Sequence, residues 1–105
     1  MGYIVIGAYK PHVGEINALS DILETHVDVL RSEGLVTKRE HIVMQAKDGT
    51  FIEIFEWVSE YSRELAIRNP VVVAVWTEMD KICTYIPASR VPEMDNLFSE
   101  LIAIN

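Results

Sequence analysis

The sequence predicts a single α+β domain over residues 1–105, in which helices pack against an antiparallel sheet of four strands. Two patterns indicate this class. Strand-like and helix-like apolar periodicities alternate along the chain, and Asp48-Gly49 joins two neighbouring strand-like runs. The length agrees, because compact domains most often contain about 100 to 150 residues. No low-complexity segment or Gly/Ser-rich linker divides the chain.

The strands are expected in segments rich in β-branched and aromatic residues. The first of these segments is followed by Pro11, and the second and third form a hairpin, because Asp48-Gly49 tolerates positive φ at both turn positions. Pro87 places the end of the last strand at a sheet edge. The four expected strands cover residues 3–10, 40–47, 50–57 and 82–88.

The helices are expected where apolar residues recur at intervals of three and four. A helix over residues 15–32 ends before Gly34, and another runs from residue 60 to 69 with Ser59 as its cap. The run VVVAVW at 71–76 favours a strand by propensity alone. Pro70, however, suits a first helical turn, and Val72, Trp76, Met79 and Cys83 have helical spacing, so we expect a helix. A short C-terminal helix should open at Pro92 and bury a stripe of Met94, Leu97, Phe98 and Leu101.

This order of elements is the split βαβ pattern of a ferredoxin-like βαββαβ domain with an extra C-terminal helix. Helices would cover one face of its four-stranded antiparallel sheet. The first strand is nevertheless apolar on both faces, so something must cover the second face. A second copy of the chain is the economical answer, because most soluble oligomers are symmetric. The two faces of that strand carry Tyr3, Val5 and Tyr9 on one side and Ile4, Ile6 and Ala8 on the other.

Composition narrows the classes of partner and compartment. Half of the residues are hydrophobic and the formal net charge is −7, which argues against a nucleic-acid partner. Cys83 is the only cysteine, as expected in a reducing compartment. The N-terminal apolar run is too short for a signal peptide or a membrane span, so we expect a cytoplasmic protein that does not bind membranes.

Two glutamates lie in the apolar run 51–57, and they are expected on opposite faces of the strand. Side chains alternate along a strand, so Glu53 shares a face with Phe51 and Phe55, whereas Glu56 points the other way to solvent or to a rim. The two therefore cannot form a carboxylate pair. Glu53 among aromatic rings must be paired, hydrogen-bonded or protonated, which fits either a catalytic carboxylate or a structural ion pair.

His26 is the second candidate for chemistry. Its spacing from Leu19, Leu23 and Leu30 turns it toward the sheet, where it is either a core histidine with satisfied hydrogen bonds or a general base. We hypothesise that His26 and Glu53 meet across a cavity as the catalytic pair. A metal site is not expected, since no short ligand spacing links the histidines or Cys83.

A set of aromatic and sulfur-containing side chains could line a pocket for a flat ligand. Such residues at regular spacing also occur as ordinary core, and both interpretations stay open. The candidate substrate-binding residues are Phe55, Trp57, Trp76, Met79 and Tyr85.

The order of elements, with FIEIFEWVS followed by RNPVVVAVW, resembles the dimeric α+β barrel superfamily, and within it the small antibiotic-biosynthesis monooxygenase-like proteins. The resemblance covers nearly the whole chain and rests on Trp57 and Ser59 followed by Asn69-Pro70. It implies two ferredoxin-like subunits packed sheet against sheet, each with a ligand cavity between its own sheet and helices. It also implies cofactor-free oxidation of aromatic substrates. Many relatives carry a histidine one turn before the Asn-Pro, but here residues 64–68 contain none, which argues against haem ligation.

Two functions follow as hypotheses. The first is a cofactor-independent monooxygenase-like enzyme acting on a small hydrophobic or aromatic metabolite, with His26 or Glu53 removing a proton. The alternative is a non-catalytic homodimer that binds a small ligand or is structural, in which Glu53 and His26 only satisfy each other.

Overall fold

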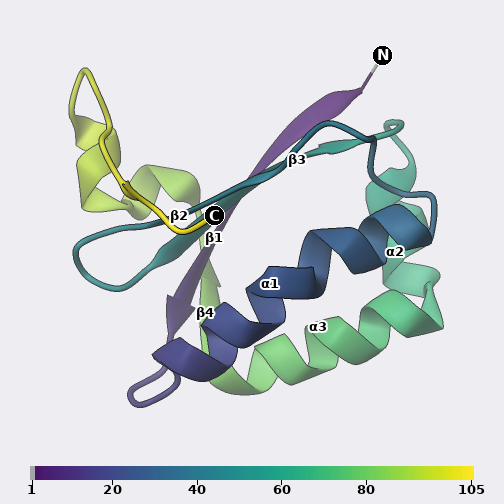
Figure 1. Ribbon diagram of the computed structural model, residues 1–105, viewed down its shortest axis with the longest axis horizontal. Coiled ribbons are helices and arrows are strands. Elements are labelled where there is room, and N and C mark those ends of the chain that lie inside the picture. The colour runs from purple at the N-terminus through teal and green to yellow at the C-terminus, as the bar shows by residue number, and fades with distance from the viewer. Residues whose placement is uncertain (1) are drawn as a thin grey trace.

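The computed structural model describes residues 2–105 and shows an α+β fold with a five-stranded antiparallel sheet and three helices. Figure 1 shows α1 and α3 side by side on one face of the sheet, with the C-terminal segment beyond its other face. The strand order is β4-β1-β3-β2-β5. In chain order, the elements are β1 (Tyr3–Pro11), α1 (Ile16–Ser32), β2 (Ile42–Gln45), β3 (Phe51–Trp57), α2 (Ser62–Arg68), α3 (Pro70–Ile82), β4 (Cys83–Ile86) and β5 (Ile102–Ala103).

The four expected strands are present, and the hairpin of β2 and β3 turns at Asp48-Gly49. The turn differs in detail from the expectation, because Gly49 alone has positive φ, at 95°. The Asp48 carboxylate instead accepts a hydrogen bond from the backbone N–H of Thr50, at 2.9 Å. An Asp-Gly turn of this kind fixes the register of β2 against β3, and this register decides which side chains of β3 face the helices.

The helix at 70–82 is confirmed, and its start is set by Asn69. The Asn69 side-chain oxygen accepts hydrogen bonds from the backbone N–H groups of Val71 and Val72, while Pro70 occupies the first helical position. Both features favour a helix start, and here they prevail over the strand propensity of the valines. The preceding helix begins later than expected, at Ser62, since Ser59 accepts a hydrogen bond from the Tyr61 N–H in a turn before it.

Asn69→Ala is expected to lower the free energy of unfolding by about 1 kcal/mol, because two backbone N–H groups at the start of α3 lose their acceptor. Asn69→Ser keeps a hydroxyl acceptor at the same place and should recover most of that loss. Urea unfolding followed by circular dichroism measures both variants. Equal midpoints for Asn69→Ala and the unaltered protein would contradict the capping role.

The expected C-terminal helix is wrong. Only a single 3₁₀ turn forms over Pro92–Asp95, and the chain then bends at residues 96–98 before it reaches β5, which pairs with β2. Asn96 and Ser99 are poor helix formers, and Leu97 is 91% exposed instead of facing the sheet. The sheet consequently has five strands rather than four.

The core between sheet and helices is closely packed, and the second sheet face is partly covered. On the helix side lie Leu19, Leu30 and Phe51, all almost fully buried. On the other side, Val91, Met94 and Leu101 of the C-terminal segment pack against Ile52. The chain itself therefore supplies part of the cover that the apolar second face requires.

The remainder of that second face is open to solvent. Ile4 is 55% exposed, Ile6 is 51% exposed and Ile42 is 47% exposed. Ile6 pairs with Ile54, which in turn pairs with Ile42, so three neighbouring strands present isoleucines together. This group of Ile4, Ile6, Ile42 and Ile54 is called the isoleucine face below.

Within residues 2–105, no helix has the length and apolar character needed to cross a membrane.

Candidate functional site

Glu53 and His26 are in direct contact, as the hypothesis of a meeting pair requires. His26 Nδ1 lies 2.7 Å from Glu53 Oε1. His26 comes from the face of α1 that packs on the sheet, and Glu53 from the face of β3 turned toward the helices. Both side chains are buried, at 4% and 0% exposure. The alternation argument is confirmed for Glu56, which lies on the opposite face and accepts hydrogen bonds from Thr37 and Arg39.

Tyr9 is a third member of this group, and it was not predicted from the sequence. Its hydroxyl donates a hydrogen bond of 2.9 Å to Glu53 Oε1, the same oxygen that His26 contacts. Burial, and then the Glu53 carboxylate, holds the pKa of Tyr9 well above its usual value, so the phenol stays protonated and remains a donor. Two donors therefore converge on one carboxylate oxygen. Within residues 2–105, the other oxygen, Oε2, is buried and has no hydrogen-bond partner.

Gly7 makes room for this arrangement. It lies opposite Glu53 in the pairing of β1 with β3. A Cβ atom at position 7 would lie only 2.7 Å from the Tyr9 hydroxyl oxygen. Because Gly7 is not at positive φ, the need for glycine here is steric.

The fourth member is Trp76 of α3. Its indole N–H donates a 2.9 Å hydrogen bond to Nε2 of His26. The four side chains of Tyr9, Glu53, His26 and Trp76 thus form one continuous hydrogen-bonded network, called the Glu-His network below. The network runs from the sheet, through α1, to α3.

The network opens into a pocket between the sheet and the helices, with a volume of about 350 Å³. His26 lines this pocket, whereas Glu53 lies behind His26 and reaches it through the imidazole. All five residues predicted to bind substrate line it together: Phe55, Trp57, Trp76, Met79 and Tyr85. We call this cavity the aromatic pocket.

Three further residues of the aromatic pocket were not predicted: Tyr9, Arg63 and Asp80. In the sequence, Tyr9 has no feature that separates it from other strand residues. Its position opposite Phe51 in the pairing of β1 with β3 is what brings it to the pocket wall. Arg63 and Asp80 are exposed charges at the mouth. Burial, and then Asp80, raises the pKa of Tyr85, so Tyr85 is also a neutral phenol in this wall.

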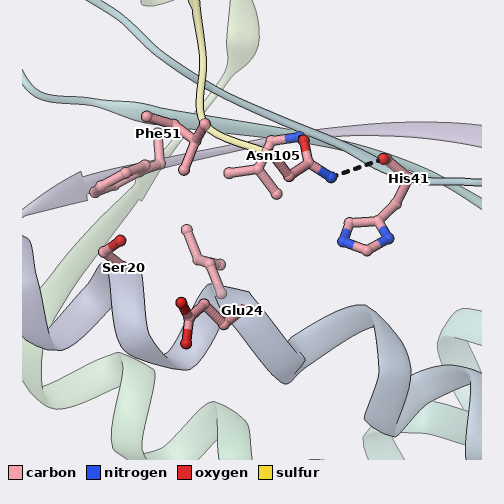
Figure 2. A pocket seen from close by; sticks show the side chains of 8 residues that line it. Ser20, Glu24, His41, Phe51 and Asn105 are labelled. Atoms are coloured by element: carbon pink, nitrogen blue, oxygen red, sulfur yellow. Dashed lines mark hydrogen bonds between the residues drawn. The ribbon is translucent and has the colours of Figure 1, made fainter.

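A second, smaller cavity of about 240 Å³ is lined by Phe51, by α1 and by the C-terminal end of the chain. In Figure 2, Ser20 and Glu24 of α1 face it from one side and His41 and Asn105 from the other. Asn105 is fixed there, since its side chain donates to the His41 carbonyl and accepts from the Val43 N–H. None of the polar side chains that line this smaller cavity is buried, so it is the weaker candidate for a site.

The described residues offer neither a cluster of metal ligands nor a reactive thiol. Within residues 2–105, no group of three or more His, Cys, Asp or Glu side chains is placed to hold a metal ion. Burial raises the pKa of the Cys83 thiol to about 11, so it is not a reactive thiolate at neutral pH. The chemistry of the site therefore depends on the carboxylate, the imidazole and the aromatic walls.

Neither models of known protein families, nor curated proteins, nor solved structures give a match to this chain.

Proposed function

We propose that the chain is a cofactor-independent, monooxygenase-like enzyme that removes a proton from a small aromatic or hydrophobic metabolite in the aromatic pocket. The observation that carries the proposal is the buried contact between Glu53 and His26 at the wall of that pocket. A carboxylate on Nδ1 orients an imidazole and stabilises the imidazolium formed when Nε2 takes a proton. This assigns His26 as the base and Glu53 as the residue that positions it.

The proposed reaction balances without a cofactor. The ligand loses a proton to Nε2 of His26, and the electron pair left on the ligand forms a C–O bond with molecular oxygen. His26 returns the proton to the peroxide. The carbon that bears the hydroperoxide then loses its remaining hydrogen as a proton while the O–O bond breaks, so that this proton and the departing hydroxide form water and a carbonyl remains. One oxygen atom enters the product and the other leaves in water. Oxygen uptake with a panel of quinol-type compounds tests the proposal, and no uptake above the uncatalysed rate across the panel would refute it.

For the fold, we propose a ferredoxin-like core that dimerises through its sheet as a dimeric α+β barrel. The order β4-β1-β3-β2 of its first four strands supports the core, with β5 as an addition at one edge. The isoleucine face supports the dimer, because contiguous exposed apolar surface of this kind marks an interface. A second copy would complete the cover that residues 88–101 begin.

In sedimentation velocity at micromolar concentration, the protein should sediment at about twice the 11.9 kDa mass of one chain. Ile6→Asp places a charge in the isoleucine face and should give a folded monomer. Val73→Asp places the same charge on an exposed valine of α3 and should stay dimeric. A monomeric unaltered protein would refute the dimer.

A non-catalytic ligand-binding or structural homodimer is the second candidate, and one contact favours it. The Trp76 indole already occupies Nε2 of His26, so both ring nitrogens have partners without any ligand. On this reading the Glu-His network only joins sheet and helices. Ligand binding in the aromatic pocket without oxygen uptake would select this candidate.

A further inference from the structure

The contacts of His26 define which of its ring nitrogens carries the proton. Nδ1 faces the Glu53 carboxylate, which accepts hydrogen bonds, and Nε2 faces the Trp76 indole N–H, which only donates. A neutral imidazole satisfies both neighbours when Nδ1 carries the hydrogen and Nε2 has the lone pair. The proton-accepting atom of the proposed base is therefore Nε2, and in this structure Trp76 covers it.

Trp76 occupies that lone pair and is itself part of the pocket wall. It is half-buried, it lines the aromatic pocket, and its indole nitrogen is 2.9 Å from Nε2. Trp57 lines the same pocket but makes no hydrogen bond to His26 within the described part of the chain. A ligand group can reach Nε2 only after the Trp76 N–H has left it.

We infer that Trp76 is a positioning residue that guards His26 Nε2, and that the ligand is an aromatic compound whose hydroxyl group replaces the indole N–H there. The inference rests on the proposed function, for which it names the ligand class. A lone pair accepts only a donor, so a phenolic or enolic O–H satisfies Nε2 where a quinone or an ether does not. Transfer then breaks the O–H bond and forms N–H at Nε2, leaving the electron pair on the ligand oxygen and an imidazolium beside Glu53.

The chain contains two tryptophans, so its NMR spectrum has two indole N–H signals, and Trp57→Phe assigns them. We expect 2-naphthol to move the Trp76 signal upfield as its hydrogen bond to His26 breaks. The methyl ether, 2-methoxynaphthalene, has the same rings without the donor and should leave that bond in place. Equal responses to the two compounds, an unmoved Trp76 signal at saturating 2-naphthol, or failure of 2-naphthol to bind would each overturn the inference.

The matched variants give a second measurement. Trp76→Phe removes the competing donor but keeps an aromatic wall, so 2-naphthol should bind about five-fold more tightly, the effect of one neutral hydrogen bond. Binding of the ether should not gain. Trp57→Phe should give 2-naphthol no such gain, and equal gains in both variants would contradict the guarding role. Oxygen uptake without displacement of Trp76 would refute this inference alone, whereas displacement without uptake would refute only the proposed reaction.

Discussion

Glu53→Ala is expected to lower the free energy of unfolding by about 3 kcal/mol, because it breaks a buried pair and leaves its partners behind. Both the His26 Nδ1–H and the Tyr9 hydroxyl would lose the acceptor that they have within residues 2–105, at buried positions. Glu53→Gln keeps an oxygen at the position of Oε1 and removes the buried charge, so its loss should be about 1 kcal/mol. Urea unfolding measures both variants.

Glu56→Ala is the matched control, since it removes the same residue type from the other face of the same strand. That carboxylate bonds Thr37 and Arg39 near solvent, and these hydrogen bonds hold its pKa below its usual value. Its loss should destabilise the protein much less than Glu53→Ala. Equal effects of the two substitutions would show that the Glu-His network is not the buried, coupled group described above.

The double variant His26→Leu with Glu53→Leu separates structure from chemistry. Replacing a buried polar pair with apolar side chains is often neutral for stability. The double variant still leaves the Tyr9 hydroxyl and the Trp76 indole N–H without acceptors, but it fills the space that Glu53→Ala empties, so it should be more stable than Glu53→Ala alone. A stable double variant without oxygen uptake would indicate that the pair is retained for its chemistry. If the unaltered protein consumes no oxygen either, the pair has a structural role.

His26→Ala is expected to reduce oxygen uptake by a factor of about 10² to 10⁴, the usual contribution of a positioned general base. The reason is that, among residues 2–105, no other side chain combines a lone pair at the wall of the aromatic pocket with an orienting carboxylate behind it. His41→Ala is the matched control, because His41 lines the smaller cavity instead. It should leave uptake unchanged. A loss of uptake in His41→Ala with none in His26→Ala would transfer the function to the other cavity.

Much of the sheet and helix pattern could be predicted because it depends on local chemistry. The Asp48-Gly49 turn fixed the hairpin, and alternation from that turn placed Glu53 and Glu56 on opposite faces of β3. The helix at α3 followed from Pro70 and apolar spacing, although its cap, Asn69, was not recognised. His26 was oriented by the same helical spacing.

The parts that were missed depend on contacts between distant segments. Tyr9 lies 44 positions from Glu53 in the sequence, and only the pairing of β1 with β3 brings the two side chains together. Trp76 was assigned to the pocket, but its bond to His26 depends on how α3 packs beside α1. The C-terminal segment has helical apolar spacing, yet it follows the sheet because its Met94 and Leu101 meet the face around Ile52.

Gly7 and Tyr9 of β1 depend on each other, because the Tyr9 hydroxyl lies where a side chain at position 7 would be. A phenol at position 9 and a lone hydrogen at position 7 occupy one shared volume, so neither can change freely while the other is kept. A methyl group at position 7 would push the phenol oxygen off the carboxylate. Phenylalanine at position 9 would remove this closest contact and leave ring carbons at 3.1 and 3.3 Å, which a small shift of the ring can relieve. Among natural variants of this chain, a side chain at position 7 should occur together with loss of the hydroxyl at position 9. The residues at these two positions therefore indicate whether the Glu53 carboxylate keeps both of its hydrogen-bond donors.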